Sequence, residues 1–131
     1  MALTLGSMTN SNTAAAIGTT YDVSKAVHLQ YQRFGSSKIS VLASMLEVQF
    51  SNIDSVTKIT ACLSRHAAGD DYVLTSTESE IQVGLTTNTK GSALFRLDVV
   101  IRDVQDQVLY LHIKTNAGTL DVSGAALTYQ Q

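Results

Sequence analysis

The sequence predicts an all-β domain, a single β-sandwich of about eight strands arranged like a jelly roll. Three observations predict it. Apolar and polar residues alternate in short segments along most of the chain, and this period of two residues is typical of half-buried strands. Turns rich in Gly, Asn and Asp separate the segments. No long segment has a convincing helical period, and short strands at this spacing form sandwiches or barrels.

Length and composition indicate one globular domain and exclude several partners. The chain has 131 residues, 44% of them hydrophobic and 15% charged, which is enough for a core without disulfides. Its net charge of −2 argues against nucleic acid as a partner. Cys62 is the only cysteine, so no internal disulfide is expected. We expect no signal peptide and no membrane span, and synthesis in a cytoplasm.

The first part of the chain differs in texture from the rest. Residues 1–26 are rich in Ser, Thr, Asn and Ala with isolated apolar residues, which predicts an extended N-terminal arm, and residues 27–131 would form the sandwich. The arm is either a loosely attached terminus or a segment that lies on a neighbouring subunit. In the second case its candidate contacts are Leu3, Leu5, Ile17 and Val23.

Of the first two segments after residue 26, one is predicted as a strand and the other is ambiguous between helix and strand. Residues 27–34 alternate, with Val27, Leu29 and Tyr31 on one face, and predict a strand. Residues 38–50 are ambiguous, because the apolar residues of the first half fit a helical stripe whereas Leu46, Val48 and Phe50 alternate as in a strand. We expect at least the second half to be a strand.

The remaining segments read more plainly as strands. They cover residues 57–65, 72–75, 81–85, 95–102, 109–113 and 120–129. In the last of them the apolar residues change from even to odd positions after Val122. A β-bulge at Gly124–Ala125 would return Leu127 and Tyr129 to the inner face.

No group of residues has the pattern of a catalytic site. The chain lacks a Gly-x-Ser-x-Gly motif, and its acidic residues fall mostly in turns, so we expect a protein that is not an enzyme. His28 and His112 fall on the polar faces of their strands. Neighbouring strands would place these two imidazoles side by side, as exposed residues or as a pH-sensitive contact. His66 falls in a polar loop.

We expect no metal and no cofactor. Cys62 and His66 are spaced as one pair of zinc ligands, but no second pair accompanies them. The carboxylates of Asp70 and Asp71 could offer oxygen ligands to calcium together with those of Glu78 and Glu80. Their spacing matches no EF-hand loop, and adjacent carboxylates usually solvate a turn.

A sugar-binding surface is the main alternative to a purely structural role. Carbohydrate sites on β-sandwiches usually stack a sugar on an exposed aromatic ring, and the chain has five Tyr and no Trp. Tyr110 points to the polar face of its strand, opposite Leu109 and Leu111. It is therefore the candidate sugar platform.

The second half of the chain resembles a known class of viral protein. The stretch Ser64–Tyr129, which includes "GDDYVL", "VGLTT", "LYLHIKTNAGTLDV" and "LTY", is similar to small jelly-roll structural proteins of tailed bacteriophages. The resemblance implies a non-enzymatic virion protein that decorates or cements a capsid or attaches to a tail. It also implies a homo-oligomer, with a trimer as the expected form, bound to a major capsid or tail protein. No site residue is carried over from it, and a carbohydrate-binding adhesin module remains the alternative.

Overall fold

The computed structural model describes residues 5–31, 38–69, 72–84, 89–105 and 108–130, and these are almost entirely strand. The strands are β1 (Leu5–Asn10), β2 (Ala14–Ile17), β3 (Val27–Tyr31), β4 (Lys38–Asp54), β5 (Lys58–Ser64), β6 (Tyr72–Glu80), β7 (Gln82–Val83), β8 (Gly91–Gln105), β9 (Val108–Thr115) and β10 (Thr119–Gln130). A short 3₁₀ turn, η1 (Val23–Lys25), precedes β3. Within these residues no helix is long enough to cross a membrane.

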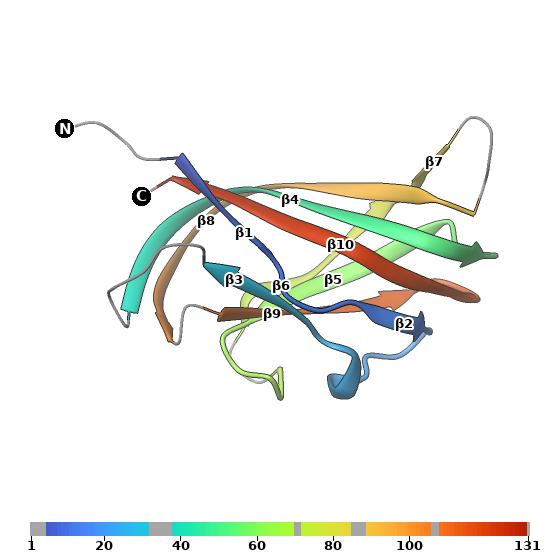
Figure 1. The fold of residues 1–131 in the computed structure, drawn as a ribbon, viewed down its shortest axis with the longest axis horizontal. Helices are drawn as coiled ribbons and strands as arrows, with labels where there is room; N and C mark the ends of the chain where they lie inside the picture. The colour runs from blue at the N-terminus through green and yellow to red at the C-terminus, as the bar shows by residue number, and fades with distance from the viewer. Residues whose placement is uncertain (1–4, 32–37, 70–71, 85–88, 106–107, 131) are drawn as a thin grey trace.

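The strands form one antiparallel path that folds into two layers (Figure 1). Its order is β6-β5-β9-β3-β1-β10-β4-β8-β7, with β2 also paired to β10. We call β1-β10-β4-β8 the β1 sheet and β3-β9-β5-β6 the β3 sheet. Consecutive long strands pass repeatedly from one sheet to the other, and this order in two four-stranded sheets is that of a jelly roll. The predicted fold class is confirmed.

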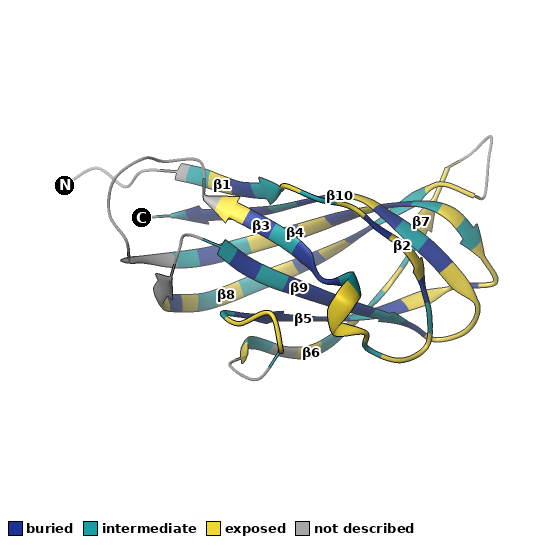
Figure 2. Ribbon diagram, turned by 60° about the horizontal axis from the view of Figure 1, so that its bottom comes forward, coloured by how far each residue is buried: buried dark blue, intermediate teal, exposed yellow. Residues whose placement is uncertain are grey.

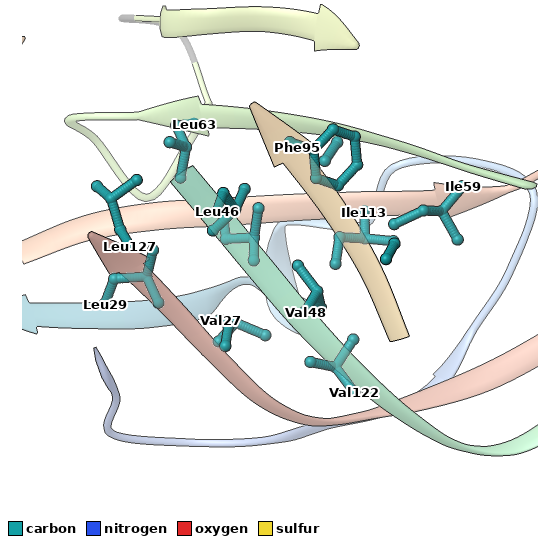
Figure 3. Close-up of a cluster of buried hydrophobic side chains, with 14 of the residues drawn as sticks. Val27, Leu29, Leu46, Val48, Ile59, Leu63, Phe95, Ile113, Val122 and Leu127 are labelled. Atoms are coloured by element: carbon teal, nitrogen blue, oxygen red, sulfur yellow. The ribbon is translucent and has the colours of Figure 1, made fainter. Parts of the chain in front are cut away.

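The core lies between the two sheets (Figure 3). Leu46, Val48, Phe95, Val122 and Leu127 enter it from the β1 sheet, and Val27, Leu29, Ile59, Leu63 and Ile113 enter it from the β3 sheet. Each is at most 3% exposed. Most of these residues hold the alternating positions that the sequence predicts to point inward, because a strand turns every second side chain to the same face. Figure 2 shows this alternation of buried and exposed residues along the strands.

The N-terminal segment is not an arm outside the core, and this part of the prediction is wrong. Strand β1 lies inside the sheet path, paired with β10 on one side and β3 on the other. Met8 is fully buried, and Ile17 is 3% exposed in the same core. Within residues 5–17 the strands β1 and β2 are extended, as expected, but both pair with β10 and so belong to the β1 sheet. The strand was missed because Met8 stands alone between small polar residues and shows no period.

Polar side chains hold this segment in place. Asn12 accepts a hydrogen bond from the His28 backbone N–H at 2.7 Å and donates one to the Ala26 carbonyl at 3.0 Å. The Asp121 carboxylate accepts hydrogen bonds from the Ala16 N–H at 2.8 Å and from Asn52 Nδ2 at 2.7 Å. These two bonds lower the pKa of Asp121. Asn12, one of the polar residues that suggest a loose segment in the sequence, therefore helps to fix it, together with Asp121 from β10.

The structure settles one ambiguous segment and changes the bounds of two others. Residues 38–50 are strand throughout, within β4, which has 17 residues paired with β10 and β8. Strand β6 continues to Glu80 rather than ending at residue 75. Only Gln82 and Val83 of the predicted strand 81–85 form β7, and Leu85 lies outside the described residues.

The predicted bulge in the last strand is confirmed. The pairing of β10 with β4 shifts between Val122 and Gly124, so Leu120 and Val122 before the shift and Leu127 and Tyr129 after it are all buried.

The turn before β10 requires glycine at position 118. Its φ is +67°, and a Cβ there would clash with the Asp54 carbonyl oxygen.

A substitution in β1 tests whether it belongs to the core. Met8→Ala should lower the free energy of unfolding by about 2–5 kcal/mol, because it leaves a cavity between the sheets. The matched control is Val23→Ala, on a side chain that is 57% exposed, and it should change stability by less than about 0.5 kcal/mol. Urea unfolding measures both. Equal, small effects would show that β1 is only loosely attached.

Candidate functional site

The aromatic and polar residues singled out in the sequence gather on the outer face of the β3 sheet, which we call the covered face. Strand pairing places two of them, His28 on β3 and Tyr110 on β9, in one row across the sheet with Ser64 on β5 and Tyr72 on β6. The row follows from the register, because residues directly opposite in antiparallel strands point to the same face. The chain thus brings the candidate platform Tyr110 to a row with a second tyrosine.

Tyr110 is held edge-on by a neighbouring imidazole. The ring centroids of His28 and Tyr110 are 4.9 Å apart, and their planes meet at 77°, an arrangement that aromatic rings favour. Both side chains are half-buried, whereas Tyr72 is 50% exposed. Tyr110 and Tyr72 are separated by one strand, so their backbones are about 10 Å apart. The His28 ring thus limits the orientations that Tyr110 can take.

A second row on the same face is buried, although it points away from the core. His112 on β9 pairs with Cys62 on β5, and the two are 3% and 1% exposed. The segment before η1 covers them with Tyr21, whose hydroxyl shares a 2.9 Å hydrogen bond with Ser76 and whose ring lies 4.9 Å from Lys114 Nζ. His28 and His112 lie on one face but two positions apart along their strands, so the expected side-by-side pair does not form.

The turn after β5 covers the other side of His112. Ser64 Oγ donates to the His66 carbonyl at 2.8 Å and accepts from the His66 N–H at 3.0 Å. Gly69 follows with a φ of +73°, and a Cβ there would lie 3.4 Å from His112 Nε2. Within the described part of the chain, His112 Nε2 is buried without a hydrogen-bond partner. An unpartnered buried nitrogen favours the neutral imidazole.

Burial shifts three pKa values on this face. It lowers the pKa of His112, because the charged imidazolium loses hydration. It raises the pKa of the Cys62 thiol and is the largest cause of the raised pKa of Tyr21. Around His112 the described titratable groups are Cys62 from β5, Tyr110 and Lys114 from its own strand, and Tyr21, with Arg65 and His66 in the turn. The side chains of His112 and Cys62 are therefore both uncharged at physiological pH.

The structure brings together no metal site among its described residues. No group of three His, Cys, Asp or Glu side chains there could hold an ion. Glu78 instead lies 3.7 Å from Lys58 Nζ in an exposed ion pair. Asp70 and Asp71, the centre of the predicted calcium loop, lie outside the described residues.

The four residues predicted as arm contacts lie in different environments in the structure. Ile17 is buried in this chain's own core, so it does not contact a neighbour. Val23 is 57% exposed on η1. Leu5 pairs with Gln130 at the end of β1. Leu3 lies outside the described residues.

The outer face of the β1 sheet has a different character, and we call it the bare face. Its described side chains are Ser7 and Thr9 from β1, Ala126 and Thr128 from β10, Met45, Glu47 and Gln49 from β4, and Leu94, Arg96, Asp98 and Val100 from β8. Leu94 and Val100 are 44% and 54% exposed. The bulge at Gly124 leaves a shallow hollow of about 210 Å³ beside Glu47 and Gln49.

Sequence reasoning missed the covering of the β3 sheet. Tyr21 carried no signal, because its partners Lys114 and Ser76 are distant in the sequence and meet it only in the fold. The placement of Tyr110 on an outer face was predicted correctly from the alternation of β9.

Comparison with known proteins identifies no family for this chain. No family model matches the chain, and no curated protein matches it. Among solved structures, the C-terminal CBM6 of LamC, a marine laminarinase from Zobellia galactanivorans, aligns with a TM-score of 0.42 and 9% identity. The alignment covers 95% of this chain and 99% of that one.

The buried imidazole predicts a stability that depends on pH. Because the pKa of His112 in the folded state lies below its unfolded value of about 6.5, the unfolded chain binds more protons between the two values. The free energy of unfolding should therefore fall as the pH drops through 6.5, with a slope of at most about 1.4 kcal/mol per pH unit. Urea unfolding at a series of pH values measures this slope.

Two variants assign the slope to this residue. His112→Phe should remove the slope near pH 6, because no group remains there to bind the proton. His28→Gln, on the same face, should retain it. A slope that survives in His112→Phe would show that another group is responsible.

Proposed function

We propose that the protein is a non-enzymatic structural subunit of a virion, a capsid decoration or cement protein or a similar component. In this proposal it acts as a homo-oligomer in the virion and attaches to a larger assembly, such as a major capsid or tail protein, after synthesis in the host cytoplasm. The observation that carries the proposal is the difference between the two outer faces. One is covered in part by the chain's own segments, and the other has no such cover among the described residues.

The bare face has the composition of a contact surface. Exposed apolar side chains of Met45, Leu94 and Val100 lie on this face among Ser, Thr, Ala and Gln, together with the charged residues Glu47, Arg96 and Asp98. Exposed apolar side chains that gather on one face, surrounded by polar residues, are typical of contact surfaces for other subunits. The jelly-roll order of the strands also supports the proposal, since viral capsid domains are among the proteins built this way. Lectin domains share that order, so the topology alone does not decide.

A second candidate function is carbohydrate binding at the covered face. The observation that favours it is the row formed by Tyr110, steadied by His28, and the exposed Tyr72. Two tyrosine side chains whose backbones are about 10 Å apart could stack on separate units of a sugar chain. The protein would then serve as a receptor-binding module of a tail or fibre.

Self-association is the first test of the structural proposal. The purified full chain should sediment as a homo-oligomer at two concentrations about tenfold apart, because mass action alone would otherwise dissociate a weak contact. An antiserum against it should label intact particles pelleted from the source culture. A monomer at both concentrations, or labelling confined to the soluble fraction, would contradict the proposal.

Glycan binding separates the second candidate from the first. If the covered face binds sugar, a glycan array should show specific binding that Tyr110→Ala reduces at least about tenfold, because the platform ring is lost. The control Val100→Ala changes an exposed residue on the opposite sheet and should leave binding intact. Absence of specific binding by the wild-type chain would reject this candidate.

A further inference from the structure

Strand β8 lacks a paired strand along much of one edge in the described part of the chain, although β6 lies beside part of it. It has 15 residues and pairs with β4 on one side. On the other side β7 pairs only with Gly91 and Ser92, and a contact from Ser79 Oγ on β6 reaches the Leu94 carbonyl at 3.5 Å. Within the described part of the chain, β8 has no strand partner on this side beyond these residues. A long unpaired edge is a template for another strand.

The side chains of this edge alternate in a pattern that suits pairing with itself. On the bare face they run Leu94, Arg96, Asp98 and Val100, all exposed. Neither Arg96 nor Asp98 forms an ion pair within the described residues. Two copies of one strand can pair antiparallel about a two-fold axis. The residue at the axis then lies opposite the same residue of the second copy. A residue a given number of positions before the axis lies opposite the residue the same number of positions after it in the second copy.

One register satisfies both the charges and the apolar residues. With the axis at Leu97, Arg96 lies opposite Asp98 of the second copy, and Leu94 lies opposite its Val100. Because of the two-fold symmetry, each of these pairs occurs twice in the dimer. An axis at Asp98 places the two Asp98 carboxylates together. An axis at Val99 places Arg96 opposite Arg102, and an axis at Arg96 places two arginines together. Like charges directly opposite are destabilising, so these registers are disfavoured.

We propose that two copies of the chain pair antiparallel through the β8 edge from Leu94 to Val100, with the two-fold axis at Leu97. The inference rests on the proposed function in one respect, that copies of the chain associate. The paired sheets would form one continuous eight-stranded sheet, and the bare faces of both copies would join into one surface for the larger assembly. A trimer, the form implied by the sequence resemblance, would need a different contact.

Charge reversal with rescue tests the register. Arg96→Asp should weaken the dimer by about tenfold or more, because each of two attractive pairs becomes a repulsive one. Asp98→Arg should weaken it similarly. The double variant Arg96→Asp/Asp98→Arg restores opposite charges and should recover the wild-type dissociation constant. Arg102→Asp, beyond the paired segment, is the matched control and should have little effect. Sedimentation equilibrium measures all four, and circular dichroism checks that each is folded.

Cross-linking tests the axis directly. Under oxidising conditions Leu97→Cys should form a disulfide-linked dimer, because the two residues 97 face each other. Val99→Cys should not, since the two residues 99 would be about 13 Å apart along the strands. The native Cys62 is buried and serves as the background.

The outcomes separate this inference from the proposed function. Rescue by the double variant together with cross-linking at position 97 alone supports the inference. An oligomer that is unchanged by Arg96→Asp, or that cross-links at position 99 instead of 97, overturns the inference and leaves the structural function standing. A wild-type chain that stays monomeric overturns both.

Discussion

The bulge in β10 is the constraint on which the rest of the sandwich depends. Strand β10 is central, paired with β4 along one side and with β1 and β2 in turn along the other. Without the extra residue near Gly124, its two halves would present their apolar side chains to opposite faces, because a shift of one residue inverts a strand. With it, Leu120 and Leu127 both enter the core. The bulge also leaves the hollow beside Glu47 and Gln49.

The outer faces of the two sheets differ in how far the rest of the chain packs over them. The β3 sheet carries Cys62 and His112 on its outside, and the chain removes them from water with Tyr21 and the turn at Gly69. This layer adds buried area but encloses an imidazole nitrogen without a partner, which costs stability when the imidazole is protonated. Within the described residues, the β1 sheet has no such cover over Leu94 and Val100, which stay exposed. Among the described residues, this sheet therefore keeps aliphatic side chains exposed on its outer face.

The sequence predicted well those strands whose period is unbroken. The alternations in β5, β8 and β9 gave the correct inward residues, and the parity change in β10 located its bulge, because both depend on local geometry alone. Strand β1 was missed, since a single Met8 among small polar residues carries no period and is recognised only by its pairing with β10. Residues 38–50 stayed ambiguous because β4 contains an irregularity near Ala43 that mimics a helical spacing. For the candidate site, the outward position of Tyr110 was readable but its contact with His28 was not, because that contact depends on which strands are neighbours.

The length of β8 connects the fold to the proposed assembly. Typical strands have about 5–6 residues, whereas β4 and β8 have 17 and 15. Strand β4 is paired on both sides, so its length serves the sheet itself. Strand β8 is not, and soluble proteins usually protect such an edge with charged side chains. Charges of one sign would repel a second copy in every register. Here Arg96 and Asp98 have opposite signs two positions apart, so they oppose self-pairing in the neighbouring registers and favour it in one. The same two residues therefore limit indiscriminate aggregation and specify a single partner arrangement.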